Sequence, residues 1–134
     1  MKIFYADDSK YFLEEAKDRG LLDCVFLLYN DKYYKITIYD KIRLIQDINE
    51  EIRTEGAFTA IPNLIIANTI TYEDIVLAIK KAINEEIIEY FYPCEVLNDK
   101  IIYIKSVKQR ETLKKMGFPY YVNKSELKEF LSNQ

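Results

Sequence analysis

The sequence predicts an α+β domain with a mixed, mostly antiparallel sheet, two hairpins and about five helices. Asn30-Asp31 and Asn98-Asp99 each separate two strand-like runs, as the turns of β-hairpins do. Stretches with apolar residues three and four positions apart, which is the helical spacing, lie between and after these hairpins. The length of 134 residues suits one domain, so we expect residues 1–134 to fold as a single α+β unit.

The first elements expected are a short N-terminal strand, a helix and a central strand. The helix should cover 9–19, because Asp7 or Asp8 can cap it and Gly20 can end it. Apolar residues occupy both odd-numbered and even-numbered positions over 22–29, so that neither face of the strand is polar throughout. This pattern is typical of a central strand that is covered on both faces.

The next strand, over 33–39, alternates between two kinds of position. Tyr34, Ile36 and Ile38 are expected to face the core, because side chains two residues apart lie on the same face of a strand. The intervening positions are expected to face outward: Tyr33, Lys35, Thr37 and Tyr39.

A helix capped by Asp40 is expected over 41–54. Ile45, Ile48 and Ile52 form an apolar stripe along it, and we expect this stripe to pack on the sheet. Such packing would turn the charged face of the helix toward solvent. The acids on that face are Asp47, Glu50 and Glu51.

The second half of the chain continues the alternation of strands and helices. The elements expected there are a short buried strand over 64–67, a helix over 72–86 capped by Thr71, an extended segment over 87–92, a hairpin of 95–97 with 100–105, a helix over 107–116 capped by Ser106, a short strand over 120–122, and a last helix from Asn123 that carries Leu127, Phe130 and Leu131.

Composition argues against secretion, membrane insertion and most cofactor chemistry. No apolar stretch approaches the ~20 residues of a membrane-spanning helix, and the N-terminal apolar run is too short for a signal peptide. We therefore expect a cytoplasmic protein in which Cys24 and Cys94 stay reduced. The chain has no His, no CxxC pair and no glycine-rich loop, which disfavours zinc sites, His-based triads and phosphate-binding loops. We expect no cofactor and no metal.

Charge is distributed unevenly along the chain. Residues 1–99 contain 11 basic and 19 acidic side chains, whereas residues 100–134 contain 8 basic and 3 acidic ones. We expect 100–134 to form a basic C-terminal segment that packs on the acidic remainder of the domain. The alternative is that two surfaces of opposite charge face different partners.

The acidic pairs of the sequence make a weak case for catalysis. Adjacent residues of a helix point about 100° apart, so neighbouring carboxylates rarely share one proton or one metal ion. Cys24 and Cys94 have no His available as a base. We therefore expect a protein that is not an enzyme. A metal-dependent enzyme without His ligands, with carboxylates from separate segments, is an alternative.

Tyrosine is abundant, with 12 residues against no tryptophan. Tyrosine suits protein interfaces, because it combines a large stiff ring with a polar tip. Some tyrosines and lysines could also form an aromatic–basic sheet face for single-stranded nucleic acid, and this secondary surface comprises Tyr33, Lys35, Tyr39, Tyr103 and Lys105. The acidic bulk of 1–99 disfavours nucleic acid as a partner. A small nucleic-acid-binding regulatory protein is thus a second alternative.

The middle of the chain resembles the small immunity proteins that bacteria pair with polymorphic or contact-dependent growth-inhibition toxins. The resemblance rests on the order of four elements: the strand over 33–39, the acidic helix ending Asp47-Ile48-Asn49-Glu50-Glu51, the strand Pro62-Asn63-Leu64-Ile65-Ile66 and the helix from Thr71. It covers about half of the chain. It implies a non-catalytic protein that neutralises a cognate toxin, often a nuclease, by stoichiometric binding and occlusion of the active site.

Acids and tyrosines are the residues expected to contact such a toxin. Toxin nucleases present basic clefts, against which an acidic partner gains association rate and specificity. The candidate partner-binding residues are Asp47, Glu50, Glu51, Glu85, Glu86, Glu89, Tyr90 and Tyr92. No membrane partner is expected, and the sequence does not define an oligomeric state.

Overall fold

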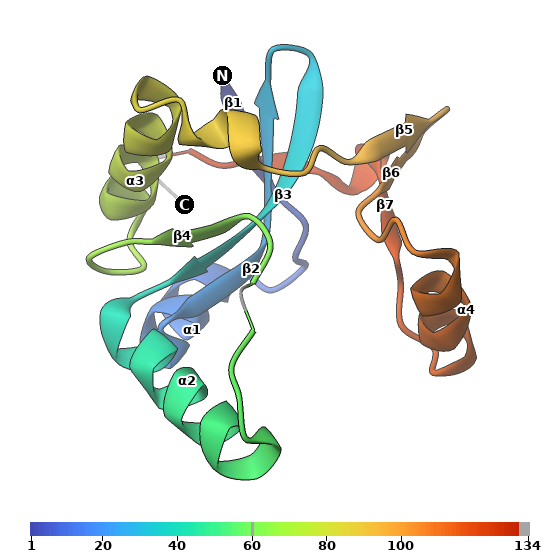
Figure 1. The fold of residues 1–134 in the computed structure, drawn as a ribbon. Helices are drawn as coiled ribbons and strands as arrows, with labels where there is room; N and C mark the ends of the chain where they lie inside the picture. Colours follow the sequence, from blue (N-terminus) through green and yellow to red (C-terminus); the bar gives the residue numbers. More distant parts are fainter. Residues whose placement is uncertain (60, 132–134) are drawn as a thin grey trace.

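A five-stranded sheet forms the centre of the computed structural model, which describes residues 1–59 and 61–131 (Figure 1). The strand order is β4-β3-β2-β1-β8. β3 and β4 run parallel, and the other neighbouring strands run antiparallel, so the expected α+β class with a mixed, mostly antiparallel sheet is confirmed. The strands are β1 (Lys2–Tyr5), β2 (Leu21–Tyr29), β3 (Lys32–Tyr39), β4 (Leu64–Ile66) and β8 (Lys128–Glu129).

β2 occupies the middle of this sheet, as the apolar residues at both of its alternating positions predict. A two-residue turn joins it to β3, and Asn30 and Asp31 in that turn have φ angles of 51° and 61°. Positive φ at both positions is the mark of a type I′ turn, whose twist matches that of the flanking strands. The second expected hairpin is also present, formed by β5 (Glu95–Leu97) and β6 (Lys100–Ile102).

Both faces of the five-stranded sheet are covered, and they belong to two separate cores. One face packs against α1 (Phe12–Arg19) and α3 (Tyr72–Asn84), and Val25 lies in this first core. The other face carries Phe26, which packs with Ile101 and Val122 of a second, smaller sheet. Successive side chains of a strand point to opposite faces, so β2 needs apolar residues on both of its faces.

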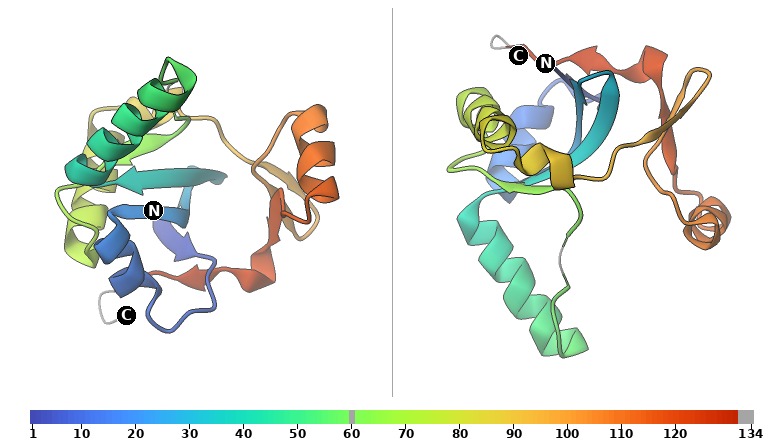
Figure 2. Two further views of the ribbon diagram at one scale, coloured as in Figure 1. Left: turned by 90° about the horizontal axis from the view of Figure 1, so that it is seen from below. Right: turned by 45° about the horizontal axis from the view of Figure 1, so that its top comes forward.

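The smaller sheet has three antiparallel strands in the order β5-β6-β7, with β7 at Tyr121–Asn123. α4 (Val107–Lys115) connects β6 to β7, and none of its residues is buried. It stands away from the five-stranded sheet and from the other helices in every view (Figures 1 and 2). No helix within the described residues is long and apolar enough to span a membrane.

The C-terminal segment differs from the sequence expectation. A short 3₁₀ turn (Lys124–Glu126) and β8 replace the last helix, and β8 pairs with the edge of β1. Phe130 is only 3% exposed, and its ring packs against those of Tyr5, Phe12 and Tyr72. Pairing with β1 satisfies backbone groups that would otherwise form an open sheet edge, and the aromatic cluster holds Phe130 there.

The segment after α3 is likewise not extended at its start. A 3₁₀ helix over Ile87–Tyr90 follows Glu86, whose φ angle of 61° turns the chain out of α3. Ile88 is 2% exposed within the first core. Ile88 lies only a few residues after α3, so the chain must turn tightly to bury it. The sequence analysis expected an extended segment there.

Two local expectations are also wrong. Asp7 does not cap α1, because its Oδ1 accepts a hydrogen bond from the Ser9 amide at 2.7 Å in a turn before the helix. β4 is an edge strand on which Ile65 is buried but Ile66 is 53% exposed, whereas the sequence predicts a short buried strand.

Candidate functional site

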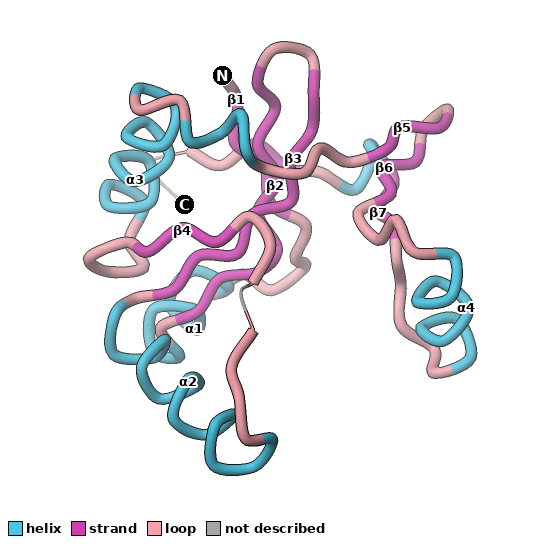
Figure 3. The backbone as a smooth tube through the Cα atoms, in the orientation of Figure 1, coloured by secondary structure: helices cyan, strands magenta, loops and turns pink. Residues whose placement is uncertain are grey.

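Two hollows of the molecule share a wall formed by Ile61 and Pro62. The first, which we call the acidic groove, has a volume of about 580 Å³ and lies between α2 (Lys41–Glu55) and the connection to β4. This connection returns along α2 toward the sheet (Figure 3). The groove is lined by Tyr39, Asp47, Glu50, Glu51, Thr54, Glu55, Phe58, Thr59, Ile61 and Pro62. Four of these side chains are acidic and none is basic.

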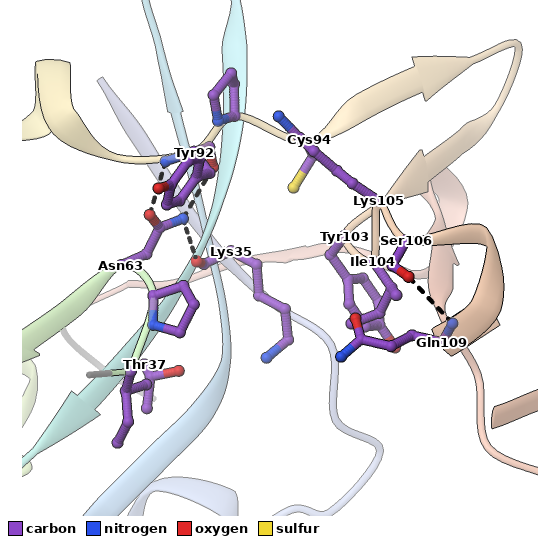
Figure 4. Close-up of a pocket in the computed structure, with 13 residues that line it drawn as sticks. Lys35, Thr37, Asn63, Tyr92, Cys94, Tyr103, Ile104, Lys105, Ser106 and Gln109 are labelled. Atoms are coloured by element: carbon purple, nitrogen blue, oxygen red, sulfur yellow. Dashed lines mark hydrogen bonds between the residues drawn. The ribbon is translucent and has the colours of Figure 1, made fainter. Parts of the chain in front are cut away.

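The second hollow, which we call the aromatic–basic pocket, has a volume of about 390 Å³. It lies between β3, the segment that leads into β5 and the segment that follows β6 (Figure 4). Its lining includes Lys35, Asn63, Tyr92, Cys94, Tyr103 and Lys105, and it contains no Asp or Glu. The two hollows therefore differ in the sign of their charge.

Polar contacts at its first two turns set the position of α2. The Asp40 side chain accepts a hydrogen bond from the Arg43 amide at 2.8 Å, which confirms the expected cap. Asp47 accepts two more, from the Tyr39 hydroxyl at 2.6 Å and from Arg43 Nε at 2.9 Å. Arg43 also donates to the Arg19 carbonyl at 3.1 Å. These bonds attach one side of the helix to β3 and to the end of α1.

The apolar stripe of α2 consequently does not pack on the sheet, contrary to expectation. Ile45 and Ile52 are 46% and 49% exposed, whereas Leu44 is buried. The polar contacts of Arg43 and Asp47 rotate the helix so that their side, which includes Leu44, faces β3. The expectation that Tyr39 faces outward is also wrong, because its side chain is buried and its hydroxyl donates to Asp47 on α2.

Hydrogen bonding fixes the charge of Asp47 at the inner end of the groove. Burial opposes ionisation of this carboxyl, but the hydrogen bonds from Tyr39 and Arg43 outweigh it and hold its pKa below the usual range. Burial and the Asp47 carboxylate together raise the pKa of Tyr39 to about 12. Tyr39 is thus a neutral donor and Asp47 an anion at neutral pH.

The acids farther along the groove are more accessible. Glu50 pairs with Arg53 of its own helix at 2.5 Å, and both side chains are mostly exposed. Glu51 and Glu55 take part in none of the ion pairs found among the described residues. Exposed pairs such as Glu50–Arg53 are weak, so these three acids can exchange their present surroundings for a basic partner at little cost.

Lysines and tyrosines are paired across the aromatic–basic pocket. Lys35 Nζ lies 5.4 Å from the ring centre of Tyr103, and Lys105 Nζ lies 5.8 Å from that of Tyr92. The Cys94 sulfur points into the same space (Figure 4). Burial raises the pKa of the Cys94 thiol, and the charges of Lys35 and Lys105 partly oppose this rise. Cys94 is therefore a protonated thiol close to two cations.

Asn63 holds the inner wall of the pocket together. Its Nδ2 donates to the carbonyls of Lys35 and Tyr92, and its Oδ1 accepts from the Tyr92 amide at 2.8 Å. Its φ angle of 54° is one that Asn tolerates better than most residues. One side chain thereby fixes β3, the entry to β4 and the segment before β5 relative to one another.

The structure brings together about half of the residues predicted from sequence. Asp47, Glu50 and Glu51 meet in the acidic groove. The pocket combines Tyr92 with three members of the secondary surface: Lys35, Tyr103 and Lys105. The residues that line neither hollow are Glu85, Glu86, Glu89 and Tyr90 near the end of α3, and Tyr33, which packs on the second core.

The other lining residues of the two hollows were missed by sequence reasoning, among them the following four. Glu55 and Phe58 line the acidic groove, and Asn63 and Cys94 line the pocket. Glu55 continues the acidic run of α2 and could have been included on that basis. Phe58 lies only three residues beyond the end of α2. Asn63 and Cys94 reach the pocket through contacts between segments distant in sequence, which no local pattern indicates.

No protein-family model, curated protein or solved structure matches the chain. In residues 1–59 and 61–131, no group of three or more His, Cys, Asp or Glu side chains is placed so that it could hold a metal ion. Cys24 and Cys94 are both free thiols.

Proposed function

We propose that the protein is a non-catalytic, cytoplasmic binding protein of the immunity type, which neutralises a toxin domain by covering its active site. The observation that carries this proposal is the acidic groove, where Asp47, Glu50, Glu51 and Glu55 face one hollow with no basic residue in its lining. A nuclease active site binds phosphates and is therefore basic, so a groove of this charge is complementary to it.

The groove also contains the kinds of contact that make an interface specific. Phe58, Ile61 and Pro62 supply apolar surface beside the acids. Tyr92, on the far side of the Ile61–Pro62 wall, is 65% exposed and is held at its backbone by Asn63. Exposed aromatic rings on a fixed backbone are typical anchors, because they lose little conformational freedom on binding. In this proposal the acids attract the toxin, and Phe58 and Tyr92 anchor it.

Two charge-reversed variants test the proposal in cells. The groove variant carries Glu50→Lys, Glu51→Lys and Glu55→Lys, and the control carries Glu85→Lys, Glu86→Lys and Glu89→Lys. The toxin domain encoded beside this protein in its native genome is co-expressed with each. The parent and the control should restore growth, and the groove variant should not. Both variants change net charge equally, and each breaks one surface ion pair.

Equal protection by the two variants would exclude the groove as the toxin-binding surface. Failure of the parent to protect against the neighbouring gene product, together with a neighbouring gene that encodes a metabolic enzyme, would contradict the immunity function itself.

A further inference from the structure

We propose that the aromatic–basic pocket binds a nucleoside phosphate, with the phosphate at Lys35 and Lys105 and the base against the tyrosine rings and apolar walls. This inference goes beyond the toxin-binding proposal: the two surfaces share Tyr92 and the Ile61–Pro62 wall, but of the two only this pocket is lined by the lysines proposed to hold the phosphate.

The charge of the pocket points to an anionic ligand. The chain contains 22 acidic and 19 basic residues, yet the lining of this cavity has two lysines and no acid. Neither lysine takes part in an ion pair among the described residues, and each ammonium lies over a tyrosine ring instead. Lysine is a common ligand of phosphate. A phosphate would therefore gain two cations that no carboxylate now neutralises.

The remaining lining fits the organic part of such a ligand. Ile61, Pro62, Pro93 and Ile104 form apolar walls, and Tyr92 and Tyr103 contribute rings on which a base can stack. Thr37 and Gln109 place polar side chains at the same cavity as Lys35 (Figure 4). A volume of about 390 Å³ is in the range of small-molecule sites.

The pocket is also held in shape before any ligand binds. The three hydrogen bonds of Asn63 fix the segment that carries Tyr92 and Cys94 to β3, which carries Lys35. The Cys94 amide donates to the Tyr33 carbonyl at 2.7 Å, and the Tyr103 hydroxyl donates to the Pro119 carbonyl at 3.0 Å. A preformed site of this kind binds without the cost of ordering its walls.

Calorimetric titration with AMP, adenosine, inorganic phosphate and a short single-stranded oligoadenylate tests the proposal. AMP should bind more tightly than adenosine or phosphate alone. Lys35→Met and Lys105→Met should each weaken AMP binding about tenfold, because each removes a charge-assisted contact. Lys108→Met should leave it unchanged, since Lys108 is exposed on α4 outside the pocket. Tighter binding of the oligoadenylate than of AMP would assign the pocket to a nucleic-acid strand, and the reverse would assign it to a free nucleotide.

Thiol modification provides a second readout that reports on the pocket directly. In a Cys24→Ser background, saturating AMP should slow the reaction of Cys94 with a thiol reagent, because the sulfur faces the cavity. The proposal is overturned if neither AMP nor the oligoadenylate binds at millimolar concentration, if AMP binds no better than phosphate, or if binding persists in the lysine variants without protecting Cys94.

Discussion

Replacement of Gly20 by alanine is expected to lower the free energy of unfolding by about 2–4 kcal/mol, because it combines backbone strain with a steric clash. Gly20 has a φ angle of 72°, and an added Cβ would lie 2.6 Å from Asp40 Oδ2 and 2.7 Å from Arg43 Cβ. Asp40 caps α2, and Arg43 holds Asp47. The substitution should therefore loosen the helix that lines the acidic groove as well as the end of α1.

Gly56→Ala is the matched control for this prediction. Gly56 also ends a helix, with a φ angle of 80°, but among the described residues beyond its own helix backbone and chain neighbours no atom lies within 4 Å of its added Cβ. We expect this variant to lose only about 1 kcal/mol, the cost of the left-handed backbone. Chemical denaturation of both variants measures the difference. Equal losses would mean that the close approach between Gly20 and α2 is absent in solution.

Phe130→Ala should produce the other large effect, a loss of about 3–5 kcal/mol, since a buried phenylalanine leaves a large cavity when truncated. Its ring centre lies 5.1 Å from that of Tyr72 on α3 and 5.9 Å from that of Phe12 on α1. The side chain therefore joins both helices of the first core to β8. Thermal and chemical denaturation would measure the loss.

Phe118→Ala provides the comparison, because the Phe118 side chain follows α4 and is 55% exposed. We expect it to change stability by less than about 1 kcal/mol. If Phe130→Ala were as mild as Phe118→Ala, the packing of the C-terminal segment on the first core would be incorrect, and a helix from Asn123 would again be possible.

Features that depend on neighbouring residues were predicted well from the sequence. The Asn30-Asp31 turn follows from the tolerance of these residues for positive φ, and the caps of α2 and α4 from the side chains of Asp40 and Ser106. The central place of β2 follows from apolar residues at both of its alternating positions. Each of these features rests on chemistry within a few residues.

Features that depend on distant contacts were not predictable in the same way. The periodicity of α2 correctly indicates a helix, but its orientation is decided by Tyr39, Arg19 and Asp47, which the stripe of isoleucines does not reveal. The spacing of Leu127 and Phe130 fits a helix, yet the open edge of β1 and an aromatic cluster favour a strand.

The candidate site likewise combines residues that local patterns indicate with residues that only distant contacts bring together. The acids of the groove lie within one helix, so the acidic face of that helix points to Asp47, Glu50 and Glu51, although the isoleucine stripe opposite them does not pack on the sheet. The aromatic–basic pocket is built from β3, the loop at Asn63 and the segments at 92–94 and 103–109. No local pattern indicates that Asn63 holds Lys35 and Tyr92 together, because those residues are 28 and 29 positions away from it.

The most direct test of the central claim, that the acidic groove receives a basic protein partner, is the association rate of the purified complex as a function of salt. The account predicts that the Glu50, Glu51 and Glu55 to Lys variant associates at least about tenfold more slowly than the parent at low salt, and that salt slows the parent but not this variant. The Glu85, Glu86 and Glu89 to Lys control should keep the rate and salt dependence of the parent. Equal rates for the two variants, or parental association that is insensitive to salt, would contradict the account.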